Sequence, residues 1–138
     1  MAVVLDASVI LKWFVEDEMS RHADGLLDRV CEEGALVPAL FRWEAQSVLV
    51  RAMLDARLDL ELMEKAFDVL SALPISVEDA GRRLMLGGEA ALALQYNLTP
   101  YDAAYLAVAL DHELELATAD NDLARAARDA EVAVFHLR

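Results

Sequence analysis

The sequence has 138 residues, of which 57% are hydrophobic, and it carries a formal net charge of −13. This length fits one domain over residues 1–138, whose core needs no disulfide. The negative charge excludes a general electrostatic attraction to nucleic acid or to anionic membranes. The one cysteine, Cys31, excludes an internal disulfide and predicts a reducing, cytoplasmic location. We expect no membrane segment, since no apolar run is long enough to span a bilayer and the first residues do not resemble a secretory signal.

Short β-rich runs alternate with longer stretches of helical periodicity along the chain, which is typical of an α/β fold with parallel strands. Strands are expected at residues 3–5, 35–40, 75–77, 114–118 and 132–137. Helices are expected at residues 8–15, 20–31, 44–53, 62–73, 79–96 with a bend at 87–88, 99–113 and 121–130. The order β-α-α-β-α-α-β-α-α-β-α-β predicts a central, mostly parallel sheet of about five strands flanked by helices.

Four acidic residues follow strands or open helices in this scheme. Asp6 follows the first strand and Asp120 the fourth, while Glu44 and Asp102 lie in the first turns of two helices. Ligands bind outside the carboxyl ends of the strands in open α/β sheets, so all four acids should meet at one end of the sheet. Neighbouring carboxylates repel one another unless a cation lies between them, and Mg²⁺ and Mn²⁺ prefer oxygen ligands. The four acids therefore suggest metal-assisted hydrolysis of a phosphodiester.

Each acid taken alone also has a purely structural explanation. Asp and Glu are favoured in the first turn of a helix, and residues 99–102 resemble a capping box with proline at the first helical position. Asp120 or Asp122 could cap the last helix, and Asp6 the first. Capping does not explain why four like charges would gather in one crevice, which favours the metal site over four separate caps.

Four segments resemble the motifs of the VapC family of PIN-domain ribonuclease toxins, in the family's order and across nearly the whole chain. They are VLDASVILKWF at 4–14, VPALFRWE at 37–44, LTPYDAAYLA at 98–107 and LATAD at 116–120. The resemblance implies a PIN-like three-layer fold and an endoribonuclease that uses Mg²⁺ or Mn²⁺ and leaves a 5′-phosphate. It also implies an acidic metal site with two supporting hydroxyls, made of Asp6, Glu44, Asp102 and Asp120 with Ser8 and Thr118.

The same resemblance implies partners. These are an RNA substrate, a small VapB-type antitoxin that inhibits the toxin, and a second copy of the chain in a homodimer. DNA would be contacted only through the antitoxin, and no membrane is involved.

Three features depart from the family pattern. Ser47 stands where family members often have Asn, and Asn121 and Asp122 follow the fourth acid where basic residues are common. The chain is also unusually acidic, so RNA must be held locally by bound metal and a few cations. Lys12 and Arg42, which lie within the first two motifs, are candidates for this contact, although both could equally be solvated residues on helix surfaces.

Other readings of the α/β pattern fit less well. A receiver domain needs an acidic pair after the first strand and a late lysine, but no lysine follows Lys65. A haloacid dehalogenase needs a second Asp where this chain has Ser8. The remaining alternative is a PIN domain with weak or no catalytic activity that serves as a protein-binding module.

Overall fold

The computed structural model describes residues 1–79 and 86–138. Five strands form one sheet in the order β3-β2-β1-β4-β5, and every pairing between neighbouring strands is parallel. The strands are β1 Val3–Leu5, β2 Ala35–Val37, β3 Ile75–Val77, β4 Leu116–Thr118 and β5 Val134–His136. The predicted α/β fold with a five-stranded parallel sheet is confirmed.

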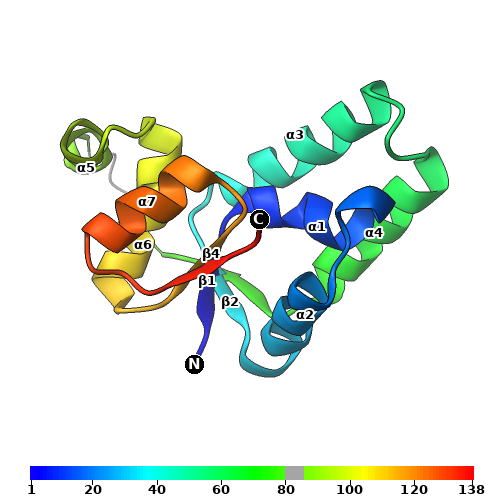
Figure 1. Ribbon diagram of the computed structural model, residues 1–138, viewed down its shortest axis with the longest axis horizontal. Coiled ribbons are helices and arrows are strands. Elements are labelled where there is room, and N and C mark those ends of the chain that lie inside the picture. Colours follow the sequence, from blue (N-terminus) through cyan, green and yellow to red (C-terminus); the bar gives the residue numbers. More distant parts are fainter. Residues whose placement is uncertain (80–85) are drawn as a thin grey trace.

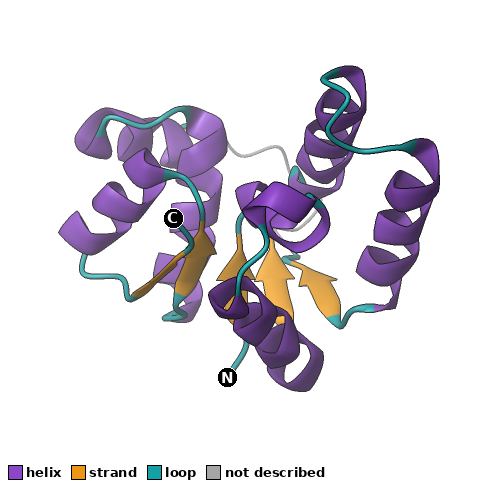
Figure 2. Ribbon diagram, turned by 45° about the vertical axis from the view of Figure 1, so that its right-hand side comes forward, coloured by secondary structure: helices purple, strands orange, loops and turns teal. Residues whose placement is uncertain are grey.

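Helices cover both faces of this sheet. They are α1 Ile10–Phe14, α2 Arg21–Glu33, α3 Phe41–Leu54, α4 Leu60–Ala72, α5 Gly88–Tyr96, α6 Pro100–His112 and α7 Asn121–Asp129, with 3₁₀ turns at Ala7–Val9 and Glu16–Glu18. Helices α1 to α4 gather on one side and α5 to α7 on the other (Figures 1 and 2). This division follows from right-handed crossovers, since the chain moves outward from β1 to β3 and then returns towards β4 and β5. Within the described ranges, no helix has the length and apolarity needed to cross a membrane.

The sequence explains where several helices begin and end. Helices α2, α4 and α6 follow Ser20, Asp59 and Thr99, each of which accepts a hydrogen bond from a backbone N–H in the first turn. Gly34 ends α2 with φ at +83°, a conformation that favours glycine. A Cβ atom at Gly34 would also lie 3.1 Å from the carbonyl oxygen of Pro74, so both backbone geometry and space require glycine.

Several predicted boundaries were wrong. The strand expected at 35–40 ends at Val37, because Pro38 has no N–H and its carbonyl oxygen instead accepts from Phe41 as α3 begins. The strands expected at 114–118 and 132–137 are shorter, at 116–118 and 134–136. The helix expected at 79–96 begins only at Gly88, after Gly87 with φ at +109°, and Asp79 is not helical. Residues 80–85 of that prediction lie outside the described part of the chain.

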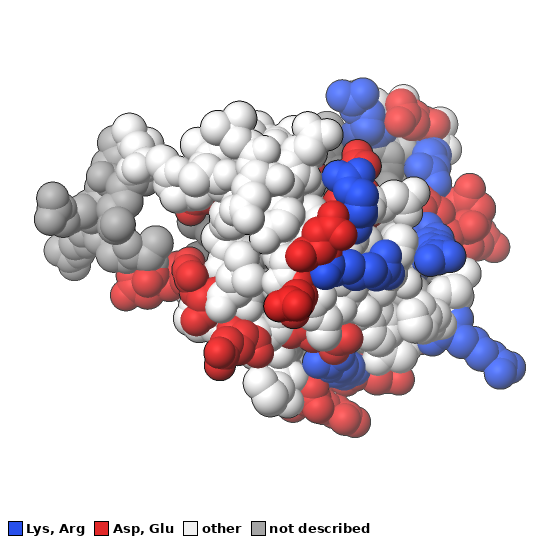
Figure 3. Space-filling model, turned by 60° about the vertical axis from the view of Figure 1, so that its left-hand side comes forward, with Lys and Arg blue, Asp and Glu red and all other residues white. Residues whose placement is uncertain are grey.

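The surface carries acidic and basic side chains side by side. Asp and Glu total 25 residues against 12 Lys and Arg. On the face shown in Figure 3, the basic side chains are interspersed with acidic ones, next to an area without charges. This face therefore has no broad basic patch of the kind that binds nucleic acid without regard to sequence.

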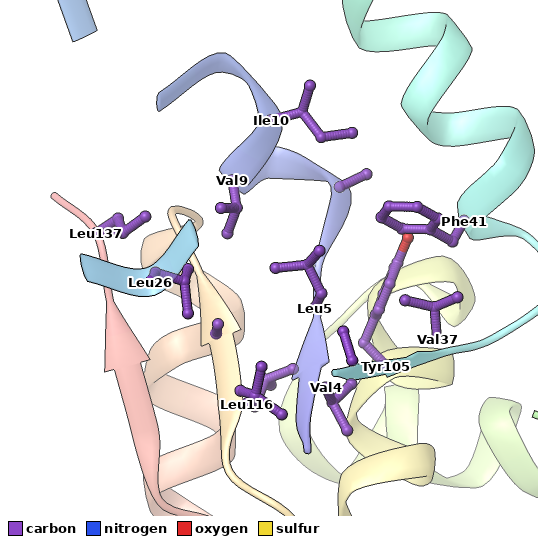
Figure 4. Close-up of a cluster of buried hydrophobic side chains, with 14 of the residues drawn as sticks. Val4, Leu5, Val9, Ile10, Leu26, Val37, Phe41, Tyr105, Leu116 and Leu137 are labelled. Atoms are coloured by element: carbon purple, nitrogen blue, oxygen red, sulfur yellow. The ribbon is translucent and has the colours of Figure 1, made fainter. Parts of the chain in front are cut away.

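The core is centred on β1, whose three residues are completely buried. Such an unbroken apolar run is typical of a parallel strand covered on both faces. Figure 4 shows Leu26 of α2, Phe41 of α3, Tyr105 of α6 and Leu116 of β4 around this strand. Helices from both outer layers are thereby packed against the middle of the sheet.

The strand order reverses at β1. The chain leaves β1 towards β2 on one side, whereas β4, which pairs with β1 on the other side, comes much later in the sequence. The backbone N–H of Asp6, just past β1, donates to the carbonyl oxygen of Ala117 in β4 at 3.0 Å. Ligand crevices form at such reversals, outside the carboxyl ends of the strands.

Candidate metal centre

A pocket of about 200 Å³ lies at this reversal of strand order. It is lined by Asp6, Ala7, Ser8, Glu44, Ser47, Val48, Asp102 and Asp120. The pocket thus brings together four acids that come from the end of β1, the first turns of α3 and α6, and the start of α7.

Asp6 is the most enclosed of these acids, with 4% of its surface exposed. Its Oδ2 accepts hydrogen bonds from Ser8 Oγ at 2.6 Å and Thr118 Oγ1 at 2.7 Å. These hydroxyls are themselves held by the backbone N–H groups of Ala119 and Asp120, both at 2.9 Å. No hydrogen bond from the described residues reaches Oδ1. Asp6 is therefore fixed through one oxygen, and the other is left for a ligand.

Two acids of the pocket, Asp6 and Asp102, have a raised pKa. Burial raises the pKa of Asp6, and the negative charges of Glu44 and Asp120 raise it further, although its two hydroxyl donors work in the opposite direction. Burial raises the pKa of Asp102 to about 6, with added repulsion from the other three acids. The protein groups around the pocket thus leave part of its negative charge uncompensated, which is the condition that a bound cation relieves.

Glu44 is held by a buried tyrosine. The hydroxyl of Tyr105 donates to Glu44 Oε1 at 2.6 Å, joining α6 to α3. The Tyr105 side chain is 0% exposed, and Figure 4 shows its hydroxyl oxygen directed towards the carboxyl end of β1. Burial raises the pKa of Tyr105 far above its ordinary value, so the phenol keeps its proton and remains a donor.

No role was predicted for Tyr105 from the sequence, although two signals were available. Tyr105 lies three residues after Asp102, so both face the same side of α6 one turn apart. A tyrosine in the apolar face of a helix also needs a partner for its hydroxyl. Together these signals indicate a polar contact close to the acidic pocket.

Asp102 and Asp120 both stand at helix N-termini, but only one of them is a cap. Asp120 Oδ1 accepts from the backbone N–H groups of Asp122 at 2.8 Å and Leu123 at 3.2 Å, and so caps α7. Asp6 precedes the 3₁₀ turn at Ala7–Val9 but makes no capping hydrogen bond. The capping explanation therefore holds for Asp120, which nevertheless also lines the pocket.

The residues that depart from the family pattern lie at different distances from this pocket. Ser47 lines it, but its hydroxyl makes no hydrogen bond within the described chain. Asn121 Oδ1 lies 3.0 Å from Nε2 of His136, and Asp122 pairs with Arg125 at 3.0 Å. Neither Asn121 nor Asp122 lines the pocket.

Lys12 and Arg42 also lie outside the pocket lining. Lys12 Nζ pairs with Glu18 Oε1 at 3.2 Å. Arg42 is exposed, and its guanidinium carbon lies 5.2 Å from the ring centroid of Trp43. Contact of these two residues with RNA stays a prediction.

The donor set suits a hard divalent cation. In the described ranges, no three carboxylate, imidazole or thiol groups are grouped closely enough to form a ready-made metal cage. Mg²⁺ usually keeps several waters and binds through only one or two carboxylates, so the pocket does not need such a cage. The four acids of the pocket offer only oxygen ligands, and Oδ1 of Asp6 accepts no hydrogen bond from the described residues. These features fit this kind of ion.

Comparisons with known proteins agree with this architecture. The family model described as PIN domain matches residues 3–129. The solved structure of PAE2754 from Pyrobaculum aerophilum is similar, with 26% identity and a TM-score of 0.66 over 91% of this chain and 87% of that one. FitAcB from Neisseria gonorrhoeae shares the fold, with 20% identity and a TM-score of 0.60 over 96% of each chain. No curated protein matches the sequence at a significant level.

PIN domains are in general nucleases that depend on divalent metal ions. The match covers all four segments that resemble the toxin motifs, and only the chain ends before residue 3 and after residue 129 lie outside it. The chain belongs to the PIN-domain family.

Proposed function

We propose that this chain is a metal-dependent endoribonuclease and the toxin of a toxin–antitoxin pair, acting in the cytoplasm as one PIN domain over residues 1–138. The observation that carries the proposal is the pocket lined by Asp6, Glu44, Asp102 and Asp120. Membership of the PIN family supports the nuclease class. The choice of RNA and the toxin role rest on the resemblance of the four motifs to VapC toxins.

The four acids would hold Mg²⁺ or Mn²⁺. Such an ion, when bound, supplies a water of lowered pKa and offsets negative charge on the phosphodiester. Ser8 and Thr118 orient Asp6 by donating to Oδ2, and Oδ1 would then be the oxygen that binds the ion. Tyr105 does the same for Glu44 by occupying Oε1. Attack by water on the phosphorus, with cleavage of the P–O3′ bond and departure of the 3′ oxygen as a hydroxyl, would leave the 5′-phosphate.

RNA would be held by local contacts. A chain with a net charge of −13 repels a polyanion at long range, so binding depends on the cation in the pocket and on nearby basic side chains. Lys12 and Arg42 are our proposed contacts from the first two motifs. Recognition would then rest on the shape of a folded RNA target.

The acidic pocket also suggests how a VapB-type antitoxin would inhibit. A guanidinium or ammonium group entering the pocket would satisfy its carboxylates in place of the metal. We therefore expect a short antitoxin with a basic tail, a homodimeric toxin, and contact with DNA only through the antitoxin. Deleting the tail should abolish inhibition, and full inhibition by a tailless antitoxin would contradict this mode.

The test of the enzymatic proposal is RNA cleavage by the purified protein in Mg²⁺, Mn²⁺ or EDTA. We expect cleavage only with metal, and a loss of about a hundredfold or more in Asp6→Asn. Asp24→Asn is the matched control, because it makes the same change on the exposed part of α2. Cleavage in EDTA, or an Asp6→Asn protein as active as Asp24→Asn, would contradict the metal mechanism. If the protein binds an antitoxin but cleaves no RNA under any of these conditions, it is instead a PIN domain without catalytic activity that serves as a protein-binding module.

A further inference from the structure

A second cleft, of about 250 Å³, adjoins the acidic pocket. The two share Ser47 and Val48, which line both. The second cleft is lined by Leu11, Ser47, Val48, Arg51, Ala52, Asp55 and Arg57. An extended polymer that binds in the acidic pocket would therefore have this cleft directly beside it.

One face of α3 leads from the pocket to Arg51. Glu44, Ser47 and Arg51 follow one another at spacings of three and four residues, so they lie on the same side of the helix. Seven residues of α-helix span roughly 10 Å. Arg51 thus stands beside the pocket, too far along the helix to reach the same phosphate as Glu44 but within reach of a neighbouring one.

Arg51 is available to an anion. It is exposed, and no ion pair joins it to any residue in the described part of the chain, including Asp55 one turn further on. Arg57, the other arginine of the cleft, pairs with Glu18 at 2.5 Å and Asp17 at 3.4 Å. Among the described residues, Arg51 is therefore the cation of this cleft that has no acidic partner.

We propose that Arg51 binds a phosphate of the RNA strand next to the one held over the acidic pocket. This inference rests on the proposed ribonuclease function. A guanidinium matches phosphate through two parallel hydrogen bonds, and it would compensate locally for the acidic surroundings. The apolar side of the cleft, formed by Leu11, Val48 and Ala52, gives the sugar and base a surface to pack against.

The experiment is steady-state cleavage of a fluorogenic stem–loop RNA with a single-stranded loop, in Mn²⁺, by wild type, Arg51→Gln and Arg21→Gln. Arg21 is the matched control, because it is an exposed arginine at the start of α2 that lines neither cleft. For Arg51→Gln we expect KM to rise about fivefold with kcat nearly unchanged, as for a lost binding contact. The slope of log(kcat/KM) against log(salt) should fall in magnitude by about 0.7, the value for one phosphate contact on a single strand.

Two further measurements keep the outcomes apart. The rise in melting temperature on adding Mn²⁺ should be the same in wild type and Arg51→Gln, which shows that the acidic pocket is intact. Arg51→Lys should have a KM between those of wild type and Arg51→Gln, since lysine keeps the positive charge but not the paired hydrogen-bond donors of the guanidinium. If Arg51→Gln behaves like Arg21→Gln in an active wild-type background, the phosphate contact is wrong while the ribonuclease stands. If wild type cleaves no RNA, the proposed function fails, and the contact with it.

Discussion

Three of the four acids of the pocket divide their two oxygens in the same way. Asp6 Oδ2, Glu44 Oε1 and Asp120 Oδ1 each accept hydrogen bonds from the protein. Within the described residues, the second oxygen of each receives none. One oxygen thus sets the orientation of the carboxylate, and the other receives no hydrogen bond from these residues. If the acids bind the proposed metal, this arrangement would hold them in place before the ion arrives.

Tyr105→Phe should weaken metal binding without unfolding the protein. The substitution removes only the hydroxyl that orients Glu44. Loss of such a supporting contact typically lowers metal affinity by roughly 10- to 100-fold. Calorimetric titration with Mn²⁺ measures this change directly. Tyr101→Phe, the same chemical change at a residue that is 66% exposed, should leave the affinity unaltered. Equal Mn²⁺ affinities for the two variants would show that Tyr105 serves only packing.

The pocket's acids were easier to predict than the groups that orient them. The positions of Asp6 and Asp120 follow from the rule that ligands gather at the carboxyl ends of parallel strands. The bond from Tyr105 to Glu44 depends instead on how closely α6 approaches α3. Periodicity shows which face of each helix is apolar, but it does not determine the contact between two polar atoms on different helices.

At the scale of elements, three helices begin beside the pocket. Helices α3, α6 and α7 each contribute an acid from the N-terminus or first turn. The partial positive charge of a helix N-terminus stabilises these carboxylates and offsets part of their mutual repulsion. Helix starts marked by a polar cap were predicted well, as at Ser20 and Thr99. The start of α5 was missed, because its cap position is Gly87 in a left-handed conformation, without a side chain to signal it.

Asp120 tests whether capping and ligand binding can be separated. Asn caps helices about as well as Asp, so Asp120→Asn should keep the stability within about 0.5 kcal/mol while lowering Mn²⁺ affinity roughly tenfold. Asp120→Ala should lose the affinity and, in addition, about 1 kcal/mol of stability. Urea unfolding and Mn²⁺ titration of both variants provide the two measurements.

Asp59→Ala is the matched control for that pair. Asp59 caps α4 by accepting from Leu62 N–H at 2.8 Å and lies outside the pocket. It should lose about 1 kcal/mol of stability and no metal affinity. If Asp120→Asn retains full Mn²⁺ affinity, Asp120 is a cap alone.

At the scale of the whole molecule, the fold brings distant parts of the chain into one site. The hydrogen bond from Thr118 to Asp6 joins residues 112 positions apart. The element order and the right-handed rule together predict two helical layers around a parallel sheet. The order of the strands and the depth of each acid are set by packing between the layers, which the pattern of a single sequence does not reveal.

The uncompensated charge of the pocket should be visible in the stability of the whole protein. Asp102 has a pKa of about 6 in the native state against 3.8 in the unfolded chain. Between these pKa values the native state binds more protons than the unfolded state. The contribution of Asp102 to the free energy of unfolding therefore grows as pH falls from 7 through 6, and it is lost as pH rises through 6. The raised pKa of Asp6 acts in the same direction. In EDTA, wild type should therefore melt at a higher temperature at about pH 5.5 than at about pH 7, since these two pH values lie on either side of the Asp102 pKa.

Metal should replace protons in this role. Mn²⁺ at a hundredfold excess over its dissociation constant should add roughly 2.7 kcal/mol, or about 10 °C in melting temperature for a chain of this size. Asp102→Asn removes one of the repelling charges, so in EDTA at pH 7 it should melt above wild type, and its response to both pH and Mn²⁺ should shrink. Thermal melts of the two proteins at both pH values, with EDTA or Mn²⁺, measure all of these effects. If Mn²⁺ shifts neither protein and Asp102→Asn melts well below wild type in EDTA, then Asp102 serves the N-terminus of α6 alone and the acids do not form a metal site.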